Sequence, residues 1–203
     1  MRIIKFAKKS LKTFMLCIGL LPIIAKAEFP QTDLDYMGLP IFCKEMHQEG
    51  AQGTPRALMW EKRLAGNGGI HHYCAGLFTY NLAWKTNNRA ERMSYLKQAI
   101  NEMVFPFKHG MVSDFVLIPK MYYDIGKAYE GLEDYKAAID NYHKSIERSP
   151  KTWMPYAALG DIYIKLNRPN EAINILEQGL EKKPDSKPLL KRLSKLKKTQ
   201  KAD

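Results

Sequence analysis

The sequence has 203 residues, of which 26% are charged and 45% hydrophobic, and its formal net charge is +11. This length suffices for one domain with its own core, and the composition excludes a disordered or low-complexity chain. Six basic residues lie before residue 28, and the rest of the chain has 26 basic and 21 acidic side chains. The remaining net charge of +5 is ordinary for a solvated surface, so we expect no nucleic acid partner.

Residues 1–27 have the three parts of a secretory signal. The apolar run at 14–24 has 11 residues, contains Pro22 and is shorter than the roughly 20 residues of a membrane span. Ala25-Lys26-Ala27 has the form of a cleavage site. The basic leader consists of Arg2, Lys5, Lys8, Lys9 and Lys12. We expect cleavage after Ala27 and export to a bacterial periplasm, with an uncleaved amphipathic anchor as the alternative.

Residues 28–70 are expected to form a loop-rich N-terminal segment. A short helix is predicted at 41–49, where Gly50 ends it. A second helix is predicted to begin at Thr54 and Pro55, because threonine is a common N-cap and proline suits the first helical position. The Gly-Asn-Gly-Gly sequence at 66–69 breaks this second helix.

Two cysteines remain once the signal and its Cys17 are removed, namely Cys43 and Cys74. In an oxidising compartment such a pair forms a disulfide by default. Closing a loop of about 30 residues stabilises a fold by about 3 to 4 kcal/mol in the chain-entropy model. The bond would pin residues 28–70 to the first helix of the domain that follows.

A metal or haem site is the alternative use of the same cysteines. Cys43 and His47 lie four residues apart, on one face of a helix, and thiolates with imidazoles can form a tetrahedral zinc site. The spacing matches no common zinc motif, and no Cys-X-X-Cys-His sequence is present for haem attachment. We therefore expect no cofactor, and a metal- or haem-handling periplasmic protein is the alternative function. Its ligands would be Cys43, His47, His71, His72 and Cys74.

Residues 71–107 predict a pair of helices, at 73–84 and 90–103. Gly76 is expected to lie where the two helices approach each other. Residues 104–113 are expected to form an aromatic, turn-rich connection around Phe105, Pro106 and Phe107. These rings either fill the junction between neighbouring helix pairs or form an exposed aromatic lip on a binding groove.

Residues 119–184 contain one pattern twice, at an offset of 34 residues. The apolar members recur at helical intervals, and a proline ends each unit. A glycine inside a helix costs about 1 kcal/mol against alanine. We therefore expect Gly126 and Gly160 to allow close approach of a second helix, at Ala138 and Ala172. The repeated positions are Tyr122, Ile125, Gly126, Tyr129, Ala138, Tyr142 and Pro150, matched by Tyr156, Leu159, Gly160, Tyr163, Ala172, Leu176 and Pro184.

This 34-residue pattern resembles the tetratricopeptide repeat, a helix–turn–helix unit that stacks on its neighbours. The resemblance implies an all-α fold, a right-handed stack of helix–turn–helix repeats with a C-terminal cap helix and a loop-rich N-terminal segment. The implied units are a degenerate repeat at 71–107, two repeats at 119–152 and 153–186, and a basic cap helix with a tail at 187–203.

Residues 187–203 predict an amphipathic helix. We interpret it as a cap, because an open stack needs a polar end for solubility. The alternative is contact with an anionic membrane surface. The apolar face carries Leu189, Leu190, Leu193 and Leu196, and the opposite face carries Lys187, Lys191, Arg192, Lys195, Lys197 and Lys198.

The resemblance also implies where a partner binds, because the first helix of each repeat lines the concave side of the stack. Three lysines beside a tyrosine suit an acidic peptide or a C-terminal carboxylate. The sequence has no nucleotide-binding loop, no nucleophile elbow and no His-Glu-X-X-His motif. We predict a non-enzymatic periplasmic adaptor or assembly factor that binds a peptide or partner subunit in this groove. The implied groove residues are Lys120, Tyr123, Lys127, Met154, Ala157, Asp161, Ile164 and Lys165.

Overall fold

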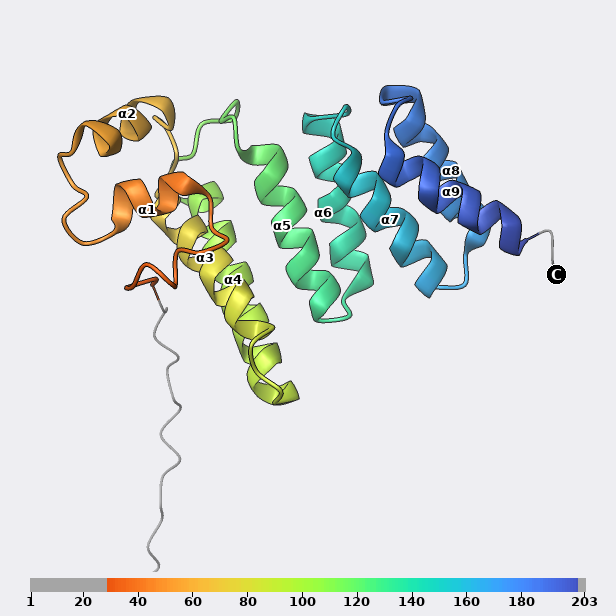
Figure 1. Cartoon of the computed structure of the whole chain (residues 1–203), viewed down its shortest axis with the longest axis horizontal. Helices are drawn as coiled ribbons and strands as arrows, with labels where there is room; N and C mark the ends of the chain where they lie inside the picture. The colour runs from red at the N-terminus through yellow and green to blue at the C-terminus, as the bar shows by residue number, and fades with distance from the viewer. Residues whose placement is uncertain (1–28, 201–203) are drawn as a thin grey trace, which may run out of the picture.

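The computed structural model describes residues 29–200, and the predicted signal at 1–27 lies outside them. Within 29–200 the chain forms nine α-helices and no strand, which confirms the all-α prediction. From α3 onward the helix pairs follow one another along the long axis of the molecule (Figure 1). No helix in this range is both long and apolar enough to cross a bilayer. The helices are α1 (Ile41–His47), α2 (Pro55–Arg63), α3 (Ile70–Ala83), α4 (Arg89–Lys108), α5 (Ile118–Gly131), α6 (Tyr135–Arg148), α7 (Trp153–Lys165), α8 (Pro169–Lys182) and α9 (Lys187–Thr199).

Three helix pairs, α3–α4, α5–α6 and α7–α8, form the body of the stack. The last two pairs repeat their backbone as well as their sequence. Glu133 and Asn167, which are 34 residues apart, both have positive φ angles, 61° and 56°, in the turns after α5 and α7. Asp134 then caps α6 through its side chain, and Pro169 occupies the first turn of α8. The two turns therefore use different residues to start the second helix at the same place.

Glycines on the first helices allow the paired helices to pack closely. A methyl group at Gly76 would lie 2.5 Å from Met103 Cγ on α4, which is closer than a real contact. At Gly126 it would lie 2.6 Å from the ring of Tyr142 on α6. The predicted close approach is confirmed. However, the side chain that faces Gly126 is the large Tyr142 and not the small Ala138. The absence of a Cβ at Gly126 leaves the space that the aromatic ring fills.

The buried side chains form two clusters along the stack. One joins the N-terminal segment to α3, α4 and α5, and the other runs from α6 to α9. Tyr129 packs against both clusters and so connects them. Leu189 on α9 is fully buried against the last pair, as expected of a cap helix, whereas Leu190 is 46% exposed.

A disulfide joins Cys43 on α1 to Cys74 on α3, with a Cα–Cα distance of 5.6 Å. This is the predicted pairing. Both cysteines are buried in the first core cluster. The bond therefore fixes the N-terminal segment to the stack at the point where both elements are already packed.

Side-chain contacts join α1 to α2. Glu45 accepts a hydrogen bond of 2.6 Å from Trp60 Nε1 and pairs with Arg56 at 2.9 Å. Thr54 caps α2 and Pro55 follows it in the first turn, as the sequence predicted.

The segment after residue 103 differs from the prediction. Residues 104–108 continue α4 through Pro106 and do not form a turn. Pro106 lies in the last turn of α4, where the lost N–H affects one hydrogen bond only, and its ring is buried. The irregular connection starts after Lys108 instead.

The aromatic rings of this segment pack at two different places. Phe107 packs against Tyr122 on α5, with ring centroids 4.9 Å apart. Phe105 stacks between His72 and His109 at 3.6 Å from each. Phe107 therefore fills the junction between α4 and α5, as the first interpretation expects, whereas Phe105 packs within the α3–α4 pair.

Candidate partner-binding groove

The helices α3, α5, α7 and α9 together line two neighbouring cavities, which we call the groove. Both cavities are lined in part by α7, where Ile164 belongs to one and Lys165 to the other. The first cavity has a volume of about 210 Å³ and is lined by Tyr80, Trp84, Lys127, Glu130, Gly131 and Lys165. The second has a volume of about 530 Å³ and is lined by Asp161, Ile164, Lys191, Arg192, Lys195, Leu196 and Thr199.

Each cavity exposes one large apolar side chain. Trp84 is 52% exposed in the first cavity and Ile164 is 45% exposed in the second. Apolar side chains exposed in a hollow that is rimmed by charges are typical of protein contact sites.

Two ion pairs fix the groove helices relative to one another. Lys165 Nζ lies 2.5 Å from Glu130 Oε1, which joins α7 to α5. Arg192 binds Asp161 at 3.0 Å, which joins α9 to α7. The hydrogen bond to Glu130 raises the pKa of Lys165, so this lysine stays charged and paired. The walls of the groove are therefore held in place without a partner.

A buried hydrogen-bond network supports the groove at α5. Asp124 is 4% exposed and accepts a hydrogen bond of 2.5 Å from the hydroxyl of Tyr73 on α3. Lys120 Nζ pairs with the same carboxylate at 2.5 Å. Burial, with the nearby Asp124 charge, raises the pKa of Tyr73 well above its usual value, so the hydroxyl keeps its proton and acts as a donor.

Lys127 lies over two aromatic rings. Its ammonium is 4.7 Å from the centroid of Tyr80 and 5.9 Å from that of Tyr123. Burial raises the pKa of Tyr123 to about 12, so the ring is neutral at physiological pH and attracts the cation through its face. Among residues 29–200, Lys127 has no carboxylate partner.

Comparison with protein families shows which kind of helical stack this is. The tetratricopeptide repeat family matches residues 131–196, from the end of α5 through most of α9. Residues 131–196 therefore contain tetratricopeptide repeats. Repeats of this family generally mediate contacts between proteins rather than catalysis. A comparison with curated proteins found no match.

Four of the eight predicted groove residues line the cavities of the stack. Lys127, Asp161, Ile164 and Lys165 line them directly. Lys120 and Tyr123 line neither cavity. They lie on α5, where the Lys120 ammonium is 5.6 Å from the Tyr123 ring, and the same ring lies below the ammonium of Lys127.

Two predicted groove residues are placed differently. Ala157 is buried in the second core cluster, so its assignment to the groove surface is wrong. Its methyl group is too short to reach past the larger side chains around it. Met154 is partly buried in the first turn of α7 and lines neither cavity.

Several groove residues were not predicted from the sequence, and two of them follow a simple rule. Tyr80 and Glu130 each lie four residues after the close-contact glycine of their helix, as does the predicted Ile164. Counting from Gly76 and Gly126 would have identified both. The residues of α9 that complete the groove carried no such signal, because α9 contains no close-contact glycine.

The predicted alternative metal ligands are not arranged as a metal site. Cys43 and Cys74 are bonded to each other, so neither offers a thiolate. Across residues 29–200 no group of three or more His, Cys, Asp or Glu side chains is placed to hold a metal ion. The metal- or haem-handling alternative therefore finds no support in the described part of the chain.

The histidines have structural contacts instead. His72 Nδ1 lies 2.6 Å from Glu102 Oε2 on α4, and the His71 and His72 rings are 4.4 Å apart. His47 Nε2 is buried and has no hydrogen-bond partner within residues 29–200. Burial lowers the pKa of His47 to about 4, so this ring is neutral in the folded protein.

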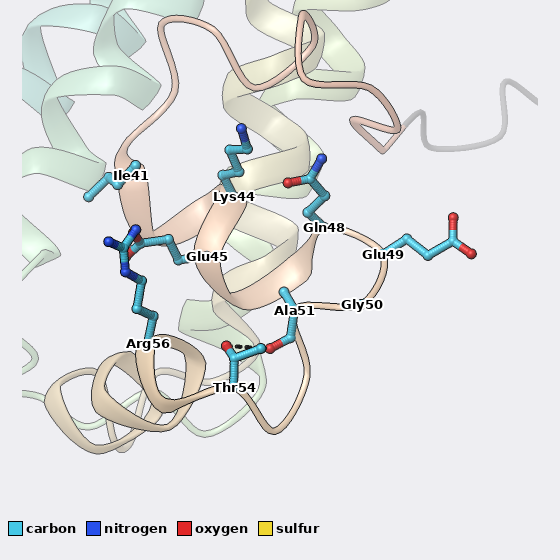
Figure 2. Close-up of a pocket in the computed structure, with 9 residues that line it drawn as sticks. All are labelled: Ile41, Lys44, Glu45, Gln48, Glu49, Gly50, Ala51, Thr54 and Arg56. Atoms are coloured by element: carbon cyan, nitrogen blue, oxygen red, sulfur yellow. Dashed lines mark hydrogen bonds and ion pairs between the residues drawn. The ribbon is translucent and has the colours of Figure 1, made fainter.

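A third cavity lies apart from the groove, between α1 and α2 (Figure 2). Its volume is about 340 Å³, and Thr54 donates a hydrogen bond of 2.7 Å to the carbonyl of Ala51 at its edge. Two of its four charged residues, Glu45 and Arg56, pair with each other. These contacts hold the two short helices together. The cavity is lined by Ile41, Lys44, Glu45, Gln48, Glu49, Gly50, Ala51, Thr54 and Arg56.

Proposed function

We propose that the protein is a non-catalytic adaptor or assembly factor that holds a peptide or a partner subunit in the groove. The observation that carries this proposal is the line of two cavities across α3, α5, α7 and α9, with Trp84 and Ile164 exposed in them. The general use of tetratricopeptide repeats in protein contacts supports it.

The groove is suited to binding because its shape is fixed in advance. The ion pairs of Lys165 with Glu130 and of Arg192 with Asp161 hold neighbouring helices together. A surface that is already ordered loses little conformational entropy when a partner binds. A partner segment therefore meets a preformed surface.

We place the protein in a bacterial periplasm. Two features support this location: the signal-like sequence at 1–27 and the Cys43–Cys74 disulfide. Disulfides persist in exported proteins and are rare in reducing compartments.

Affinity capture from the native cell envelope tests the proposed function. The wild-type protein is compared with a Tyr123→Ala/Lys127→Ala double variant, and we expect the double variant to lose at least about tenfold of the captured partner, equal to about 1.4 kcal/mol. The matched control is Lys136→Ala, which changes an exposed lysine on α6 outside the groove. Equal capture by all three proteins would show that the groove does not hold the partner.

A further inference from the structure

The cations of the groove fall into two groups. Lys165 and Arg192 are neutralised by Glu130 and Asp161. Lys127, Lys191 and Lys195 have no anionic partner among residues 29–200. The groove therefore has an excess of positive charge, and these three lysines supply it.

Lys127 is the best placed of the three to bind an anion. It is partly buried in the first cavity, over the rings of Tyr80 and Tyr123, and Trp84 lines the same cavity. A charge pair formed where water is partly excluded is stronger than one on an open surface. A carboxylate at Lys127 would place the neighbouring residue of the same peptide near Trp84.

Lys191 and Lys195 form a second positive site. They are four residues apart on α9, so both point to the same side of the helix. Both line the second cavity together with Ile164 and Leu196. Each cavity thus combines unpaired positive charge with exposed apolar surface.

We propose that the partner segment of the groove is an acidic protein segment that also carries apolar side chains. One carboxylate side chain binds Lys127 beside an apolar residue that packs on Trp84. Further carboxylates face Lys191 and Lys195 beside an apolar residue on Ile164. This inference rests on the proposed function, because it assigns the chemistry of the partner in the same groove.

Selection of peptides on the full protein tests this chemistry. A library of random peptides of about 12 residues is selected on the wild-type protein, and peptides are kept if they fail to bind a Lys127→Ala/Lys191→Ala/Lys195→Ala variant. We expect the kept peptides to have a net negative charge and at least one aromatic or large aliphatic residue. Changing their Asp and Glu to Asn and Gln should weaken binding about tenfold or more. Raising the salt from about 0.05 to 0.5 M should weaken it as well.

The matched control for the triple variant is Lys136→Ala/Lys144→Ala/Lys97→Ala, which removes the same charge from α4 and α6. This control should bind the selected peptides within about twofold of the wild type. Thermal unfolding of both triple variants checks that each remains folded.

The outcomes separate the two proposals. If the kept peptides are neutral or basic, the acidic chemistry is overturned. The adaptor role still stands in that case, provided that capture of the native partner depends on Tyr123 and Lys127. Equal loss of peptide binding in both triple variants would show a general charge effect and would also overturn it. If no peptide depends on the groove and partner capture is unchanged in the Tyr123→Ala/Lys127→Ala variant, both proposals fail.

Discussion

The hydroxyl of Tyr73 donates a hydrogen bond of 2.5 Å to the carboxylate of Asp124, which lies 51 residues further along the chain. Tyr73 is 1% exposed and Asp124 is 4% exposed, so neither group has water as an alternative partner. This bond connects α3, which lacks the clear repeat pattern, to α5, which has it. It helps to explain why an imperfect helix pair stacks on a regular one.

Removing this hydroxyl should destabilise the fold. Tyr73→Phe keeps the ring but leaves the buried Asp124 with Lys120 as its remaining side-chain partner, and loss of such a donor costs about 1 to 3 kcal/mol. Urea unfolding measures the change. The control is Tyr163→Phe, whose hydroxyl makes no hydrogen bond within residues 29–200. Equal effects of the two changes would argue against a role for the Tyr73 bond.

The disulfide should contribute strongly to stability. Cys43 and Cys74 are 31 residues apart, and closing a loop of this length is worth about 3 to 4 kcal/mol in the chain-entropy model. We expect a thiol reductant to lower the urea midpoint of the wild-type protein. The Cys43→Ala/Cys74→Ala variant should start at the lower midpoint and not respond to reductant. A wild-type midpoint that reductant leaves unchanged would contradict this account.

The two close-contact glycines of the clear repeats should respond differently to alanine. At Gly126 an added methyl group meets the rigid ring of Tyr142 at 2.6 Å, whereas at Gly160 it meets the flexible end of Leu176 at 3.0 Å. Alanine gains about 1 kcal/mol of helix propensity at either site, but overpacking costs about 1 to 3 kcal/mol. We expect a net loss for Gly126→Ala and a change within about 1 kcal/mol for Gly160→Ala. Thermal unfolding that ranks the two variants the other way would refute this reading of the packing.

Stability should fall with acidification because of His47. Its pKa is lowered to about 4 in the folded protein, mainly by burial and also by His71, whereas an unfolded histidine titrates near 6.5. Between these pH values the unfolded state binds more protons than the folded state. The population of the unfolded state therefore rises as the pH falls from about 6.5 to 4. Solvent screening of this partly exposed ring reduces the effect to about 1 to 2 kcal/mol.

The His47→Leu variant isolates this contribution. It removes the titrating group and the unpaired Nε2, so the difference in unfolding free energy between wild type and variant should depend on pH in this window. Urea unfolding at pH 7 and pH 4.5 measures it. Parallel pH profiles for the two proteins would exclude His47 as the source.

The stack could be predicted from the sequence because the 34-residue repeat is kept at the positions where neighbouring helices pack closely. Gly126 and Gly160 lie at equivalent positions, and the positive φ angles of Glu133 and Asn167 follow the same 34-residue offset. The cysteine pairing was also predictable, since only Cys43 and Cys74 remain outside the signal.

The end of α4 and part of the groove could not be predicted, because they depend on contacts between distant segments. Pro106 reads as a helix breaker, but the stacking of Phe107 on Tyr122 compensates for it late in α4. Burial of Leu189 and Leu193 orients α9 on the last helix pair, but the pairing of Arg192 with Asp161 across the groove is a contact that no local pattern reveals. Ala157 was assigned to the surface by position alone, and position does not say how far a short side chain reaches.

Photo-crosslinking tests the central claim, that the groove holds a protein partner, most directly. A photoreactive phenylalanine analogue is placed at Trp84 or Ile164, both exposed in the groove, and at Lys97, exposed on α4 away from it. We predict that the two groove positions crosslink to the same partner in the cell envelope and that position 97 does not. Crosslinks from position 97 alone, or none from the groove positions while the partner is still captured, would contradict the proposed binding surface.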